Sequence, residues 1–124
     1  MEFFSEVPVR PDPDTIRQQL VIDKLPALCD SIDTVLADQG DSGRIYCLWG
    51  EFDIRREEIR NGVRFSLSSC PNALAWTITR DDDEQDLTLH CTINTHAPDG
   101  DFIESIELFL DDWARGLQQV FGNA

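Results

Sequence analysis

The chain has few basic side chains for its size. Its 124 residues include one lysine, nine arginines and two histidines against 24 carboxylates, and the formal net charge is −14. Such an acidic surface repels nucleic acids and anionic membranes, so we expect neither as a partner. Solubility, or adaptation to a salty cytoplasm, is the simplest explanation of the acidity. Mimicry of DNA or inhibition of a basic protein is the alternative.

Sequence patterns of common enzymes are also missing. There is no G-x-S-x-G, no Gly-rich phosphate loop and no dinucleotide-binding fingerprint. The acidic run 81–84 does not start a calcium loop, because the Gly and Glu required at positions six and twelve are absent. His90 and Cys91 would point to opposite faces of a strand, which argues against a metal site formed with His96. We therefore predict no catalytic residue, no metal and no cofactor.

The four cysteines include no C-x-x-C pair. Cys29, Cys47 and Cys91 fall at apolar positions of predicted elements, whereas Cys70 falls in a turn. This pattern favours reduced thiols in a cytoplasmic protein. The acidic start of the chain has no apolar stretch typical of a signal peptide, and no apolar run is long enough to span a bilayer.

The last fifth of the chain predicts one long amphipathic helix over residues 101–121. Asp101 is a candidate N-cap, and Gly122 follows the last periodic residue. Gly116 is an interior glycine, explained either by a neighbouring backbone or by a suboptimal position. The stripe that would face the core consists of Phe102, Ile103, Ile106, Phe109, Leu110, Trp113, Leu117, Val120 and Phe121.

The first third predicts an extended segment over residues 1–11 and then a kinked helix. Asp12-Pro13 is a typical helix start. Pro26 should break the hydrogen bonding near residues 22–25. Apolar residues at helical spacing continue to residue 36, and Gly40 would end the helix.

Between these helices, alternating apolar residues predict four strands, at 45–54, 63–67, 74–78 and 87–93. Gly50 would form a bulge in the first, and Asn61-Gly62 is a strong hairpin signal. Short turns between successive strands favour an antiparallel meander. We therefore predict a single α+β domain over residues 1–124: an N-terminal kinked helix, a four-stranded sheet and a long C-terminal helix, with both helices on one sheet face.

Two candidate sites follow from this fold. Residues 45–49 are apolar in both directions and would form an edge strand, which must be paired or covered. Residues 1–9 could cover the outer face; otherwise a protein partner or a second copy could bind there. The candidate partner-binding residues are Tyr46, Leu48, Ser66, Ser68, Ala75 and Thr77. The alternative site is a pocket for a small apolar ligand between Trp76 and Trp113.

Size, acidity and a helix-flanked antiparallel sheet are similar to those of bacterial secretion chaperones, a similarity of the fold alone. We therefore expect a small acidic cytoplasmic protein without enzymatic activity that binds another protein, as a chaperone-like module or as a homodimer. A binder of small apolar ligands is the competing expectation.

Overall fold

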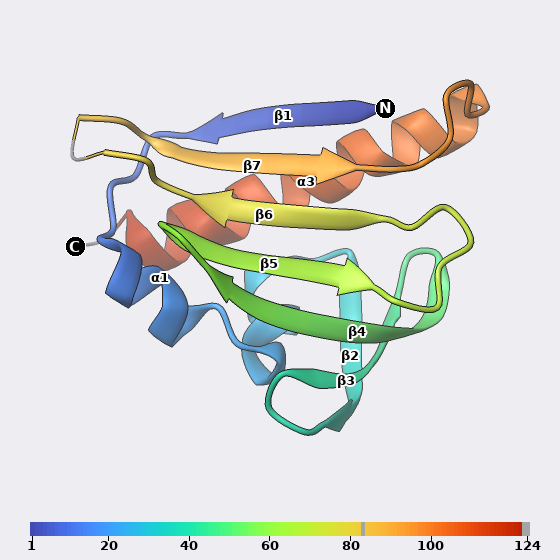
Figure 1. Ribbon diagram of the computed structural model, residues 1–124, viewed down its shortest axis with the longest axis horizontal. Coiled ribbons are helices and arrows are strands. Elements are labelled where there is room, and N and C mark those ends of the chain that lie inside the picture. Colours follow the sequence, from blue (N-terminus) through green and yellow to red (C-terminus); the bar gives the residue numbers. More distant parts are fainter. Residues whose placement is uncertain (83, 123–124) are drawn as a thin grey trace.

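Alternating apolar side chains build one antiparallel sheet of seven strands, with helices along one side (Figure 1). The computed structural model describes residues 1–82 and 84–122. The sheet order is β1-β7-β6-β5-β4-β3-β2. The strands are β1 (Glu2–Val7), β2 (Ile32–Asp38), β3 (Ser42–Cys47), β4 (Gly50–Ile59), β5 (Gly62–Leu67), β6 (Ala75–Thr79) and β7 (Leu87–Thr92).

The helical segments are α1 (Pro13–Gln19), a 3-10 turn η1 (Ile22–Lys24), α2 (Leu25–Leu28) and α3 (Gly100–Phe121). The long C-terminal helix is confirmed, but its N-cap is Asp99, whose carboxylate accepts a hydrogen bond from the backbone N–H of Phe102 at 2.8 Å. Asp101, the predicted cap, lies within the first turn. No helix in the described part of the chain is long and apolar enough to cross a membrane.

The core lies between the sheet and the helical layer. Phe65 of β5 and Trp76 of β6 are opposite each other in the register and both point inward. They join one buried cluster with Ile16 of α1, Leu28 of α2 and Trp113 of α3. Figure 1 shows α3 running behind the sheet. The helices therefore share one face of the sheet.

The predicted kinked helix over residues 12–36 is wrong. α1 ends at Gln19, and Val21 is extended, with φ −118° and ψ 156°. Pro26 lies at the start of α2, where its missing N–H costs no helical hydrogen bond. The chain becomes extended again at Cys29, and residues 32–38 form a strand.

The helical spacing of Ile32 and Val35 was misleading because β2 is bulged. Its pairing with β3 shifts register between Ile32 and Thr34, and again between Val35 and Ala37. A bulge inserts one residue and reverses the alternation of side chains. Ile32 and Val35, three residues apart, therefore both face the core, as they would on a helix.

The predicted strand over residues 45–54 is two strands. Leu48 and Trp49 turn the chain back on itself, and Gly50 follows with a left-handed φ of +114°. Cys47 pairs with Gly50, and Ile45 pairs with Phe52. β3 consequently lies between β2 and β4, so the predicted edge strand is internal. The predicted hairpin at Asn61 is confirmed, with a φ of 67°.

The N-terminal segment supplies a strand that the sequence analysis left undecided. β1 pairs antiparallel with β7 along its whole length, from Glu2 opposite Thr92 to Val7 opposite Leu87. It lies in the plane of the sheet and forms one edge, with β2 at the other. β1 therefore extends the sheet and does not fold over its outer face. The sheet has seven strands where four were predicted.

Candidate binding surface

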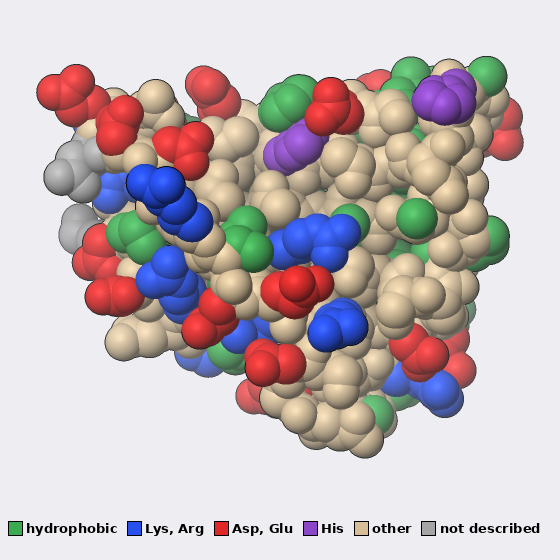
Figure 2. Space-filling model, in the orientation of Figure 1, with side chains coloured by type: hydrophobic (Ala, Val, Ile, Leu, Met, Phe, Trp, Pro, Cys, Tyr) green, Lys and Arg blue, Asp and Glu red, His purple; other side chains and the backbone are tan. Residues whose placement is uncertain are grey.

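The side of the sheet opposite the helices is the main candidate surface, and we call it the outer sheet face. No helix of residues 1–82 and 84–122 covers it, and it is the side that Figures 1 and 2 present to the reader. Basic side chains lie among acidic ones on it, beside wide uncharged areas. Strand alternation and register place on it Glu2, Phe4, Glu6, Ser42, Arg44, Tyr46, Glu51, Asp53, Arg55, Glu57, Arg64, Ser66, Ala75, Thr77, Thr79, Thr88, His90 and Thr92.

One row of paired residues crosses the middle of this face. Phe4 is opposite His90, His90 is opposite Thr77, Thr77 is opposite Arg64, and Arg64 is opposite Glu57. The rings of Phe4 and His90 are stacked, with centroids 4.3 Å apart and planes at 4°. Phe4 nevertheless leaves 64% of its surface exposed. The row therefore ends in an accessible aromatic side chain at β1.

Charges on the outer sheet face largely neutralise one another. Three arginines stand among five carboxylates, a difference of two charges in a chain whose net charge is −14. Most of the carboxylates are paired on the face itself. The ion pairs are Arg44–Asp53 at 3.0 Å, Arg44–Glu51 at 3.8 Å and Arg64–Glu57 at 3.2 Å. Glu2 lies 2.9 Å from Nε2 of His90, within hydrogen-bond distance.

Tyr46 and Leu48 lie at the β3 side of this face. Tyr46 projects outward from β3, opposite Glu51 of β4, and is 50% exposed. Leu48 lies in the turn after β3 and is 38% exposed, and its backbone N–H donates to the Ser31 carbonyl. Phe3 and Phe4 belong to the opposite edge of the sheet, so they do not cover either side chain.

The four small candidate residues lie nearer the centre. Ser66 of β5 and Ala75 of β6 are directly opposite each other, and Thr77 is next along β6 on the same face. Ala75 is only 3% exposed although it points outward, because its small side chain lies below the longer neighbouring ones. Ser68 lies beyond β5 and is exposed. The structure therefore brings Ser66, Ala75 and Thr77 together, with Tyr46 and Ser68 nearer the margin.

A wide hollow of about 930 Å³ lies beside the β2–β3 hairpin. Ser68 and the outward-facing Arg44, Glu51, Asp53 and Arg55 contribute to its lining. The outer sheet face is therefore concave at this end. Leu36, the exposed residue within the second bulge of β2, also lines the hollow.

Trp76 and Trp113 meet across the sheet–helix interface. Their ring centroids are 6.1 Å apart, and Phe65 and Phe109 pack against both. Both indole N–H groups are buried without a hydrogen-bond partner in the described structure. Aromatic rings occupy the space proposed for a ligand. A second hollow, of about 470 Å³, is lined by other residues, between the start of α1 and the end of α3.

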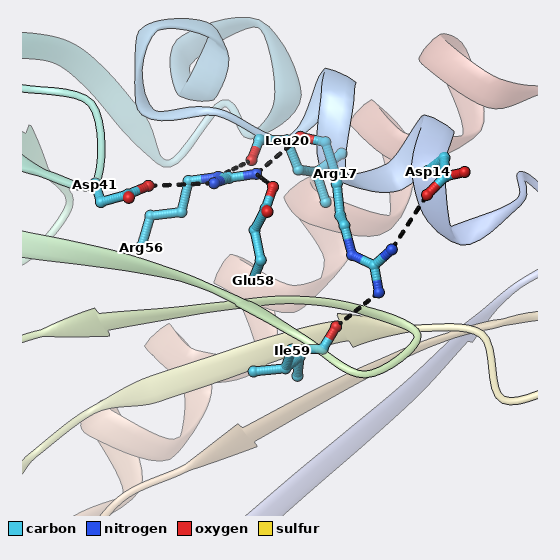
Figure 3. Close-up of polar contacts among 7 residues, drawn as sticks. All are labelled: Asp14, Arg17, Leu20, Asp41, Arg56, Glu58 and Ile59. Carbon is cyan, nitrogen blue, oxygen red and sulfur yellow. Dashed lines mark hydrogen bonds and ion pairs between the residues drawn. The ribbon is translucent and has the colours of Figure 1, made fainter.

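Arg56 is a buried cation that the sequence analysis did not single out (Figure 3). Its side chain points inward from β4 and donates to the carbonyls of Leu20 at 2.7 Å and Arg17 at 2.8 Å. Asp41 and Glu58 each lie 3.3 Å from the guanidinium. The last carbonyls of a helix have no partner within the helix. Arg56 therefore caps the C-terminal end of α1 from the sheet.

Arg80 holds the segment just before α1. Its guanidinium donates to the carbonyls of Arg10 and Pro11 at 3.0 and 3.1 Å, and to that of Gln85 at 3.0 Å. The sequence signal for Arg56 was a charged residue at an inward-facing strand position. The partners of Arg56 at the end of α1 are 36 and 39 positions away in the chain, so the sequence did not identify them.

All four cysteines are free thiols. Burial raises the pKa of Cys29 and of Cys91 to about 12, and it also raises the pKa of Cys47. Cys70 is partly exposed. His90 and Cys91 point to opposite faces, as predicted, and no cluster of metal-ligating residues occurs in the described ranges. Asp83, within the acidic run 81–84, lies outside the described residues.

Comparison with other proteins gives a likeness of fold. No protein-family model matches the chain, and no curated protein matches it. The structure is similar to that of the protein XoxI from Bacillus cereus. The TM-score is 0.66 at 17% sequence identity, over 98% of this chain and 94% of XoxI. At this identity the likeness shows a shared fold, so the function must be argued from the surface.

Proposed function

We propose that this chain is a non-enzymatic protein-binding module that engages its partner through the outer sheet face. The observation that carries the proposal is that the helices cover only one face of the seven-stranded sheet in the described residues. Three helices pack on one face, and Phe4, Tyr46 and Leu48 stand exposed on or beside the other. Tyr46 and Leu48 lie together near one end of this face and Phe4 lies at the other end. Exposed apolar side chains within a broad polar surface are typical of binding sites.

The composition of the face supports protein as the ligand. Its centre consists of small uncharged side chains, and its charges are mostly paired within the face, so an approaching protein meets little unbalanced charge. A chaperone-like role belongs to this proposal. The cytoplasm is the proposed location, because the four cysteines are free and three of them are buried.

Native mass spectrometry of the protein purified under mild conditions tests this function. We expect the parent to retain a stoichiometric protein, either a second copy or a different chain. Leu48→Glu places a charge beside Tyr46 and should release that protein while secondary structure is kept. Leu108→Glu is the matched control, because Leu108 is 52% exposed on the helical side.

Two results would contradict the proposal. The first is a parent that carries no protein at any concentration tested. The second is a retained protein that Leu48→Glu and Leu108→Glu release equally, which would locate the contact elsewhere. A bound small molecule in place of a protein would favour the competing hypothesis of an apolar-ligand binder.

A further inference from the structure

We infer that the occupant of the outer sheet face is a second copy of this chain, bound sheet to sheet. The inference rests on the proposed function and names its partner. It follows from three features of the described residues: the distribution of charge between the two sides of the molecule, the area of the face, and the placement of an exposed aromatic side chain at one end and a hollow at the other.

The first feature is charge. The chain carries −14, yet the outer sheet face contributes only a small part of it, because Arg44, Arg55 and Arg64 offset carboxylates there. The helical side differs: Asp101, Glu104, Glu107 and Asp111 are all exposed on α3. Two copies that meet through their helices would bring these carboxylates together, whereas two copies that meet through their sheets would not.

The distance between the two helical layers makes this difference in charge repulsion large. Stacked sheets lie ~10 Å apart, and each α3 lies behind its own sheet. The two helical layers of a sheet-to-sheet pair are then separated by more than the Debye length, which is ~8 Å in physiological salt. Their mutual repulsion is therefore largely screened. The outer sheet face thus allows two copies of a highly acidic chain to associate.

The second feature is area. Seven strands at ~4.8 Å spacing and about six residues long at ~3.3 Å each give a face of roughly 600 Å². Two such faces bury about 1,200 Å², the lower end of the range for specific protein interfaces. Twisted sheets of the same hand pack face to face with strands about 30° apart. The ion pairs of the outer sheet face would become buried in this interface and weaken it. We therefore expect a dimer that dissociates on dilution.

The third feature is self-complementarity. A twofold axis along β5, the central strand, would place the β1–β7 end of one copy over the β2–β3 end of the other. Rotation about this axis keeps each residue at its level along the strands, so the stacked Phe4 and His90 would lie over the β2–β3 hairpin of the second copy, beside the hollow that Leu36 and Ser42 help to line. Thr77, next to the central strand, would lie deep in the interface. Each copy would thus place its exposed Phe4 against the hollow end of the other.

The experiment is sedimentation equilibrium of the purified chain over a wide concentration range. We expect the mass to rise from 14.1 kDa to twice that value as concentration increases. Thr77→Lys should shift the dissociation constant by tenfold or more, because it adds a cation beside Arg64 and His90 at the centre of the face. Gln118→Lys makes the same change of charge on an exposed position of α3 and should leave association unchanged.

Circular dichroism of both variants checks that the fold is kept. A parent that stays monomeric at every concentration overturns the inference, as does equal weakening by Thr77→Lys and Gln118→Lys. If the parent is monomeric alone but retains a different protein that Leu48→Glu releases, the inference fails and the proposed function stands. If the parent associates with neither itself nor another protein, both fail.

Discussion

Gly116 of α3 lies directly against the backbone of Leu28 in α2. A Cβ atom built on Gly116 would be 1.8 Å from the Leu28 carbonyl oxygen and 2.5 Å from its carbonyl carbon. Backbone atoms of a packed segment cannot move aside as a flexible side chain can. The close approach of the two helices therefore explains why glycine, a poor helix former, occupies the middle of α3.

Gly116→Ala should destabilise the protein although alanine favours helices. The intrinsic preference favours alanine by about 1 kcal/mol, but forced separation of α2 and α3 costs about 1–3 kcal/mol or more by overpacking. We expect a net loss in the free energy of unfolding, measured with urea. Gly100→Ala is the control, because a Cβ there meets nothing within 4 Å. Equal stability of the two variants would contradict the close approach.

Arg56→Gln should destabilise far more than Arg55→Gln, its neighbour on β4. The shorter side chain leaves the buried carbonyl of Leu20 and the partly buried carbonyl of Arg17 without their donor. An unsatisfied buried group costs about 1–3 kcal/mol. Arg55 faces outward and is exposed, so its loss should change the free energy of unfolding by less than about 0.5 kcal/mol. Urea unfolding followed by fluorescence measures both. Similar values for the two variants would refute the capping role.

Thiol labelling of the native protein should modify Cys70 first. The thiolate is the reactive form, and burial raises the pKa of Cys29 and Cys91 to about 12, so near pH 8 both are protonated as well as inaccessible. Mass spectrometry after short exposure should show one modified thiol, and Cys70→Ser should remove it. Rapid modification of Cys91 would mean that β7 is shifted by one residue.

Stability should fall in acid partly through Asp12, the N-cap of α1. Its hydrogen bond from the Thr15 backbone N–H holds the pKa of Asp12 below its usual 3.8. A carboxyl group whose pKa is lower in the folded protein than in the unfolded chain stabilises the fold at pH values above its unfolded-state pKa. That contribution is lost as the pH falls through the folded-state pKa. The stability advantage of the parent over Asp12→Asn, which does not titrate, should be constant near neutrality and shrink below about pH 4. An advantage independent of pH would disprove this.

Only part of the candidate surface could be predicted from the sequence. Ser66, Ala75 and Thr77 could be grouped from strand alternation, because each alternates with buried neighbours. Phe4 and His90 could not, because their stacking depends on the pairing of β1 with β7 across most of the chain. Arg44, Arg55 and Arg64 likewise come from three strands, and only the register shows that they share a face.

The sequence by itself determined the features set by local periodicity: the long helix α3, the alternation in β5, β6 and β7, and the turn at Asn61. Each depends on backbone geometry within a few residues. The tertiary structure alone decided the rest. Bulges in β2 made Ile32 and Val35 mimic a helix, and pairing with β7 turned the first residues into an edge strand. These depend on hydrogen bonds to distant strands, which local spacing does not encode.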